Sequence, residues 1–202
     1  MTYGPTLIIF ARCPVLGTVK KRLGRDIGPV AATAFYRQCL AGVIRRLACD
    51  PRWRTILAVT PDRTLQWKAW PQGPRRIPQG PGDLGSRMAH VLASVSPGPA
   101  ILIGSDIPTV EPSHIARAIR LLGSHDAVFG PAADGGYWLV GLRRRPQFID
   151  PFGRVRWSSP HALTDTLANL KGARVAILDI LEDIDNGASH ARWQHDEGQR
   201  LK

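Results

Sequence analysis

The stretch "TLIIFA", residues 6–11, is a short run of apolar and mostly branched residues that ends at a loop containing proline and glycine. Such a run is typical of a buried strand. Residues 29–48 follow with apolar side chains at helical spacing, Pro29 in the first turn and Arg45 and Arg46 near the end. This pattern predicts a helix. A buried strand followed by a helix is the unit from which parallel sheets are built.

The same alternation continues along the chain. No change in composition divides its 202 residues, of which 44% are hydrophobic, and residues 61–85 are too rich in proline, glycine and tryptophan for a long regular element. We therefore expect a single α/β domain over residues 1–202, with a mainly parallel sheet and helices on both faces. The expected strands are residues 54–60, 100–106, 126–131, 135–142 and 173–179, and the expected helices are residues 84–95, 111–123, 159–170 and a polar tail.

Composition excludes several classes of protein. No apolar run is long enough to cross a membrane, and no signal peptide is recognisable, so we expect a soluble cytoplasmic protein. The three cysteines, Cys13, Cys39 and Cys49, lack the CxxC spacing of a structural zinc site and are odd in number. They therefore indicate neither a disulfide framework nor bound zinc.

The net charge of +11 is unevenly distributed. Residues 12–54 carry ten basic side chains against Asp26 and Asp50, whereas residues 179–197 carry six acidic side chains against Arg192 alone. The first segment should attract anions, and the second could bind a metal. We expect the two segments to meet around a metal-bound phosphate. A nucleic-acid-binding domain is a weaker interpretation of the charge, because no helix-turn-helix, RNA-recognition or zinc signature is present.

Ligands of parallel α/β sheets bind beyond the carboxyl ends of the strands. After the first strand, residues 11–24 place Lys20, Lys21 and Arg22 just beyond Gly17, which allows close backbone approach. This arrangement suits a diphosphate, although it is neither a Walker A loop nor a GxGxxG motif. The alternative interpretation is a surface turn with a solvated basic face.

Two further loops carry candidate ligands. "IGSDIPTV", residues 103–110, places Asp106 at the tip of a buried strand, where it could hold Mg²⁺ or Mn²⁺ together with substrate phosphates, or form an Asx turn. "QGPGDLGSRM", residues 79–88, places Gly82, Asp83 and Arg87 ahead of a helix. That loop could contact a base or phosphate, or could simply cap the helix.

Two later segments complete the candidate site. In "LEDIDNG", residues 181–187, we expect only one of Asp183 and Asp185 to face the site, on the assumption that the two side chains alternate in direction. "GPAADGGYWLVGL", residues 130–142, places Asp134 before a glycine pair at the entrance to a strand. The alternative for Asp134 is a turn in which one glycine takes positive φ and the carboxylate bonds its own backbone.

In order and spacing, the chain resembles a bacterial family of glycosyltransferase-like proteins with the GT-A nucleotide-diphospho-sugar transferase fold. Some members are arsenosugar-biosynthesis glycosyltransferases, and the family is distantly similar to 2-phospholactate and molybdenum cofactor guanylyltransferases. The resemblance covers nearly the whole chain. The segments that carry it are "FARCPVLGTVKKRL", "GDLGSRM", "GSDIPTV", "GPAADGGYWLVGL", "RWSSPHAL" and "EDID".

The resemblance implies a Rossmann-like GT-A sheet that binds a nucleotide with Mg²⁺ or Mn²⁺. The family's usual Val-Lys-Thr-Arg-Leu has Lys21 in place of Thr here, so a charge replaces a hydroxyl. The expected site has Asp134 as the catalytic acid–base group, Asp106 and Asp185 as metal ligands, Arg12, Gly17, Lys20, Arg22, Gly82, Asp83 and Arg87 for the nucleotide and phosphates, and Gly135, Gly136, Tyr137, Trp157 and Ser158 on the acceptor side.

Two reactions use such a site. A nucleotide sugar could transfer its sugar to a small-molecule acceptor whose hydroxyl is activated by Asp134, which we take as the leading hypothesis. Alternatively, a phosphorylated acceptor could attack the α-phosphate of a nucleoside triphosphate. Lys21, together with Arg154 and Arg156 on the acceptor side, would suit an anionic acceptor, whereas Trp157 could stack on a ring. The base, sugar, acceptor and oligomeric state are left open by the sequence.

Overall fold

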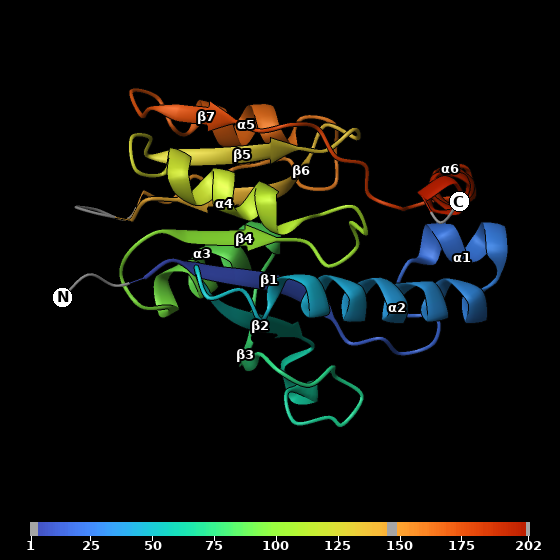
Figure 1. Ribbon diagram of the computed structural model, residues 1–202. Coiled ribbons are helices and arrows are strands. Elements are labelled where there is room, and N and C mark those ends of the chain that lie inside the picture. Colours follow the sequence, from blue (N-terminus) through green and yellow to red (C-terminus); the bar gives the residue numbers. More distant parts are fainter. Residues whose placement is uncertain (1–3, 145–148, 201–202) are drawn as a thin grey trace.

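The computed structural model describes residues 4–144 and 149–200. Within them a seven-stranded sheet runs through the centre of the molecule (Figure 1), with the strand order β3-β2-β1-β4-β6-β5-β7. The strands are β1 (Thr6–Arg12), β2 (Arg54–Thr60), β3 (Arg75–Pro78), β4 (Ala100–Ile103), β5 (Ala127–Pro131), β6 (Tyr137–Leu142) and β7 (Val175–Ile177).

The sheet is mixed. Strand β1 pairs in parallel with β2 and β4, and the pairs β2–β3 and β5–β7 are also parallel. Strand β6 lies between β4 and β5 and is antiparallel to both. The first strand is buried at nearly every position, as its apolar run predicted. The expectation of a Rossmann-like α/β fold with a mainly parallel sheet is confirmed.

Helices cover both faces of the sheet. Helices α2 and α4 pack with Leu7 and Ile9 of β1 on one face, whereas α3 and α5 pack with Ile8 on the other. Successive residues of a strand point to opposite faces, so each strand contributes to two apolar layers. The helices are α1 (Lys21–Ile27), α2 (Pro29–Leu47), α3 (Leu84–Ser94), α4 (Pro112–Leu121), α5 (Ala162–Ala168) and α6 (Gly187–Arg200), with a short 3-10 turn, η1 (Asp62–Thr64).

Besides the short turn η1, one strand and one helix were not expected from the sequence. Strand β3 lies in the proline- and glycine-rich segment and pairs with β2 at the edge of the sheet, where the proline at its last position costs no ladder hydrogen bond within the sheet. Helix α1 has only seven residues and begins after Lys20, whose φ of 47° is left-handed. Both elements are too short to show a hydrophobic period.

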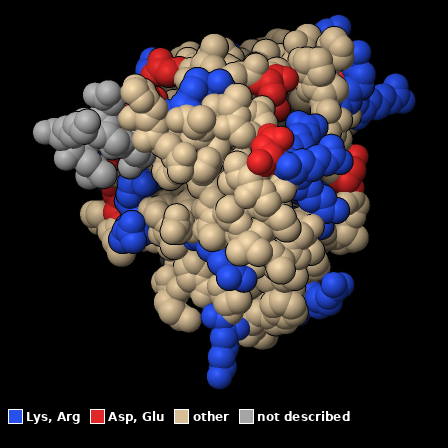
Figure 2. Space-filling model, turned by 90° about the vertical axis from the view of Figure 1, so that its right-hand side faces the viewer, with Lys and Arg blue, Asp and Glu red and all other residues tan. Residues whose placement is uncertain are grey.

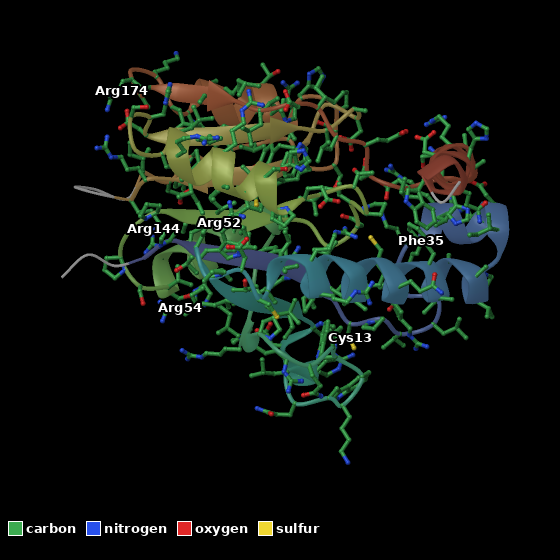
Figure 3. The ribbon with its side chains drawn as sticks, in the orientation of Figure 1. Cys13, Phe35, Arg52, Arg54, Arg144 and Arg174 are labelled. Carbon is green, nitrogen blue, oxygen red and sulfur yellow. The ribbon has the colours of Figure 1, made fainter. Side chains whose placement is uncertain are left out.

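Helix α6 returns the end of the described chain to its beginning. It lies beside α1 (Figure 1). Phe35 of α2, which is labelled in Figure 3, contacts the rings of His190 and Trp193 edge-on, at 5.1 and 5.2 Å between centroids. The backbone N–H of Gly187 donates a 2.7 Å hydrogen bond to Asp26 Oδ2. This packing holds the acidic segment before α6 next to the basic loop before α1.

None of the helices within the described residues combines the length and apolar character needed to cross a membrane. The parallel strands β1, β2 and β4 all end at the same edge of the sheet. Seen from that side, acidic and basic side chains lie next to one another on the surface (Figure 2). This edge contains the candidate site.

Candidate functional site

Lys20 is the cation at the centre of the site. Its ammonium Nζ lies 2.8 Å from Asp106 Oδ2 and 2.6 Å from Asp185 Oδ1, and its side chain is only 5% exposed. Burial lowers the pKa of Lys20, but the charges and hydrogen bonds of the two carboxylates outweigh it and raise the pKa. The ammonium is therefore firmly charged and links residues from the first loop, the loop after β4 and the segment before α6.

Three carboxylates converge at this point. Asp106, Asp183 and Asp185 each offer an oxygen within 4.8 Å of the other two. Burial and the negative charges of Asp185 and Asp106 raise the pKa of Asp183 to about 6. Burial also acts on Asp185, but Lys20 outweighs it and lowers the pKa of that carboxyl. The cluster thus carries more negative charge than Lys20 offsets.

The expectation that only one of Asp183 and Asp185 faces the site was wrong. Both line the same pocket. Side chains two positions apart on an extended segment share a side, and the residue between them, Ile184, is buried in the core. The hydroxyl of Ser189 accepts hydrogen bonds from the backbone N–H groups of Asp185 and Asn186, which fixes the turn into α6.

The donor set fits a divalent cation. Mg²⁺ and Mn²⁺ prefer carboxylate oxygens, and such sites commonly use few protein ligands because substrate phosphates complete the shell. The three convergent carboxylates, with their excess of negative charge, meet this requirement. Lys20 is the group with which such a cation would compete for Asp106 and Asp185.

A cavity of about 500 Å³, called the basic pocket, opens on one side of the cluster. Arg22 lies 3.9 Å from Asp185 Oδ2 and is 71% exposed, so its guanidinium remains accessible. Arg87 donates a 3.1 Å hydrogen bond to Gln79 Oε1, which orients it from α3. The pocket suits phosphate groups. Its basic lining residues are Arg12, Lys20, Lys21, Arg22 and Arg87.

A second cavity of about 400 Å³, called the acidic pocket, opens on the other side. It shares Phe10, Leu84, Gly104, Asp106 and Asp185 with the basic pocket, so the two are adjoining halves of one site. The acidic pocket is lined by the carboxylates Asp106, Asp134, Asp183 and Asp185, by the aromatic residues Phe10, Tyr137, Trp138 and Trp157, and by Gly136 and Ser158 among others.

Asp134 forms the turn that was its alternative interpretation, and it also lines the acidic pocket. Its Oδ1 accepts a 2.9 Å hydrogen bond from the backbone N–H of Gly136, and Gly135 has a φ of 86°, which is the predicted Asx turn. The same carboxylate lines the acidic pocket. A Cβ at position 135 would collide with the backbone of Pro160, so glycine permits the close approach of the segment before α5.

Some predicted residues lie elsewhere. Gly17, Gly82, Asp83 and Gly135 line neither pocket. Asp83 caps α3 by accepting a 2.8 Å hydrogen bond from the backbone N–H of Ser86, which lowers the pKa of Asp83. For this loop the capping interpretation therefore describes the structure. Arg156, which had been expected to meet an anionic acceptor, instead pairs with Asp165 through two 2.8 Å hydrogen bonds.

The sequence did not identify Phe10 and Trp138 as residues that line the acidic pocket. Phe10 is the one half-exposed position within an otherwise buried run of β1, and no local pattern distinguishes it from its neighbours. Trp138 donates its indole N–H to the backbone carbonyl of Asp179 at 3.2 Å, a contact between β6 and the chain after β7. Asp183 carried a signal that was misread, because its spacing from Asp185 already placed the two on one side.

Comparison with solved structures supports a nucleotide-dependent transferase fold. A candidate nucleotide-diphospho-sugar transferase from Desulfovibrio desulfuricans G20 is 29% identical, with a TM-score of 0.83 over 90% of this chain and 82% of that one. Two others share the fold. Rv0371c of Mycobacterium tuberculosis H37Rv, solved with manganese, is 18% identical (TM-score 0.57; 95% and 98% covered), and CMP:2-keto-3-deoxy-manno-octonic acid synthetase, solved with CTP, is 13% identical (TM-score 0.62; 98% and 100% covered).

No curated protein matches the sequence. Of these three solved structures, one is described as a candidate nucleotide-diphospho-sugar transferase and one as a synthetase, and none of them determines the substrate of this chain. Residues 43–159, more than half of the chain, match a bacterial family, and the chain therefore belongs to the family described as uncharacterized proteins conserved in bacteria (DUF2064).

Proposed function

We propose that this protein is a metal-dependent transferase that uses a nucleotide-activated donor, and that it transfers a sugar. The observation that carries the proposal is the junction of the two pockets. There a buried lysine from the first loop meets carboxylates that lie 86 and 165 residues further along the chain. Such a junction suits a nucleotide sugar whose diphosphate lies in the basic pocket and whose sugar enters the acidic pocket.

The basic pocket supplies the charge that a diphosphate needs. Lys20 is a fixed point charge, and Arg22 and Arg87 present guanidinium groups that can bond phosphate oxygens. These side chains stabilise the negative charge on the leaving nucleoside diphosphate. That charge is larger in the transition state than in the bound donor. A divalent cation on Asp106, Asp183 and Asp185 would supply further neutralisation of the same charge.

Asp134 is the proposed general base. Its Oδ1 is held by the N–H of Gly136, and within the described residues no hydrogen bond occupies Oδ2. In sugar transfer, an acceptor oxygen forms a bond to the sugar's anomeric carbon as the bond from that carbon to the diphosphate breaks. The proton of the acceptor hydroxyl passes to Asp134, and the nucleoside diphosphate leaves.

Nucleotidyl transfer is the second candidate. In that reaction an acceptor phosphate oxygen bonds to the α-phosphorus of a nucleoside triphosphate, and diphosphate leaves. The observation that favours it is Lys21, an additional cation lining the basic pocket that would suit the longer triphosphate chain. A synthetase that was solved with CTP has the same fold, which also agrees with nucleotidyl transfer.

Calorimetric titration tests the proposal. UDP, GDP, CTP and GTP are titrated into the protein with Mn²⁺ and again with EDTA. We expect metal-dependent binding of at least one nucleotide, and loss of the metal-dependent part in Asp106→Asn. Glu182→Gln is the matched control, because Glu182 neighbours Asp183 in sequence but pairs with Arg192. Absence of metal-dependent binding, or equal loss in both variants, would contradict the proposal.

Product analysis then separates the two reactions. Consumption of a nucleotide sugar with release of a nucleoside diphosphate supports sugar transfer. Consumption of a nucleoside triphosphate with release of diphosphate supports nucleotidyl transfer.

A further inference from the structure

We propose that the acidic pocket accepts a hydroxyl-bearing ring that is uncharged or positively charged, and that it rejects groups carrying a carboxylate or a phosphate. The inference rests on the proposed function, since the pocket adjoins the place assigned to the donor diphosphate. It defines a substrate class that neither the family nor the similar structures specify.

The charge of the lining is the first observation. Four carboxylates face the acidic pocket, namely Asp106, Asp134, Asp183 and Asp185, and among the described residues that line it none is lysine or arginine. An anion placed there would meet repulsion in a partly dehydrated space, where charges interact more strongly than in water.

The cations around the acidic pocket do not make it attractive to an anion. Lys20 and Arg22 offset part of the negative charge, but both face the basic pocket, where a diphosphate would engage them. One divalent cation together with Lys20 and Arg22 supplies as many positive charges as the four carboxylates supply negative ones. The remaining cations, Arg12, Lys21 and Arg87, line only the basic pocket. The donor's own diphosphate then adds negative charge at the junction.

The two arginines expected on the acceptor side do not line either pocket. The guanidinium of Arg156 is held by Asp165 through two 2.8 Å hydrogen bonds, and Arg156 lines neither pocket. Arg154 likewise is absent from both linings. An anionic group in the acidic pocket would therefore find no guanidinium among the described residues that line it.

Aromatic walls supply the attraction for a ring. Tyr137 and Trp157 lie 6.4 Å apart between ring centroids and 72° from parallel, and both line the pocket with Phe10. Aromatic faces pack well against the apolar face of a sugar and attract cations. The carboxylates and the hydroxyl of Ser158 can bond ring hydroxyl groups or an amine. A volume of about 400 Å³ is sufficient for such a ring.

Matched nucleotide sugars test the inference. UDP-glucose, UDP-glucosamine and UDP-glucuronic acid share the same base, diphosphate and type of ring, and the last two each differ from UDP-glucose in one substituent. If the protein prefers GDP to UDP, GDP-mannose and GDP-mannuronic acid are used instead. Each competes with the labelled nucleoside diphosphate in the presence of Mn²⁺. We expect the neutral sugar and the amino sugar to bind at least about tenfold more tightly than the acid, a difference of about 1.4 kcal/mol.

Two variants identify the cause of the discrimination. Asp134→Asn removes one carboxylate from the pocket and should reduce the ratio between neutral and acidic sugars. Arg156→Gln is the control and should leave that ratio unchanged, because its guanidinium is held by Asp165. If Arg156→Gln selectively weakened binding of the acidic sugar, the guanidinium would be an anion receptor and the inference would be overturned.

The outcomes are distinguishable from failure of the proposed function. If no nucleoside diphosphate binds, the donor site itself is wrong and the inference falls with it. If the diphosphate binds but the acidic sugar binds as tightly as the neutral one, only the substrate class is wrong. Tighter binding of the acidic sugar would overturn the inference and favour an anionic donor sugar.

Discussion

The two ends of the sheet hold charge in opposite ways. At the carboxyl end, Lys20 is buried between acids that are distant in sequence. At the amino end, Figure 3 labels arginines whose bonds lie on the exposed surface: Arg54 with Ser96 and Arg174 with Asp126. The difference teaches that the net charge of +11 says little about function. What matters is where a charge is buried and which segments it joins.

Asp134→Asn gives the largest expected effect, because it removes the proposed proton acceptor at the carboxyl end. The amide oxygen of Asn can still accept the Gly136 N–H, so the turn should persist. We expect turnover of the donor, measured as release of nucleoside diphosphate, to fall by at least about 100-fold. Affinity for the nucleoside diphosphate, measured by calorimetry, should remain unchanged. Undiminished turnover would remove Asp134 from the mechanism.

Lys20→Met tests the buried cation. Without metal, the substitution leaves Asp106 and Asp185 without their cationic partner. The free energy of unfolding should therefore fall by about 2 kcal/mol. This loss is smaller than for a fully buried ion pair, because the side chains of Asp106 and Asp185 are 34% and 36% exposed. Mn²⁺ should reduce the deficit by replacing the ammonium, and should bind the variant more tightly than the wild type when nucleotide is absent.

Urea unfolding and Mn²⁺ titration measure these changes. Lys21→Met is the matched control: Lys21 lines the same pocket but makes no ion pair within the described residues. Equal stability of Lys20→Met and wild type, or equal losses in both variants, would mean that the buried contact has no energetic role.

Asp183→Asn tests the excess of negative charge through pH. The folded-state pKa of Asp183, about 6, lies above its usual value of 3.8, so the folded protein binds this proton more tightly than the unfolded chain. The stabilisation of the folded protein by this bound proton is therefore present at low pH and is lost as pH rises through about 6. Without metal, the variant should exceed the wild type by about 1 kcal/mol at neutral pH, and the gain should vanish near pH 4.

Asp185→Asn provides the opposite sign in the same experiment. The pKa of Asp185 is lowered, so its ionised form stabilises the folded protein above the usual carboxyl pKa, and that stabilisation is lost as pH falls. The substitution should therefore destabilise the protein at neutral pH. Urea unfolding between pH 4 and pH 8 measures both variants, and the same sign for both would refute the assigned charges.

Arg54→Gln gives the smallest expected effect and represents the amino end. Its guanidinium bonds the Ser96 hydroxyl at 2.8 Å on the exposed surface, so its loss should change neither nucleotide affinity nor the midpoint of urea unfolding measurably. A clear loss of nucleotide binding would show that the two ends are coupled, and the contrast between them would no longer hold.

The sequence predicts those elements whose pattern is local. Strand β2 was predicted at residues 54–60, as observed, and α2 was predicted to within one residue, because a buried apolar run and an amphipathic period can be read without the rest of the fold. Strand β3 could not be predicted, since its four residues include Pro78 and depend on pairing with β2. The antiparallel insertion of β6 is likewise a property of the assembled sheet.

The candidate site was predictable to a similar extent. Strand ends indicated Lys20, Arg22, Asp106, Asp134 and Asp185, all of which line the two pockets. The sequence could not show which carboxylates Lys20 contacts, because Asp106 and Asp185 lie 86 and 165 residues further along the chain and meet Lys20 only in the assembled fold. Nor could it show that Arg156 pairs with Asp165, since both interpretations of an arginine before α5 were open.

The return of α6 to α1 has a consequence for biosynthesis. Lys20 leaves the ribosome long before Asp185, so a nascent chain can assemble β1, α2 and β4 while the cluster still lacks two of its three carboxylates. A product truncated by premature termination before residue 183 would keep most of its core yet could not complete the cluster. Under the proposed function, such a product would lack the metal-dependent part of donor binding.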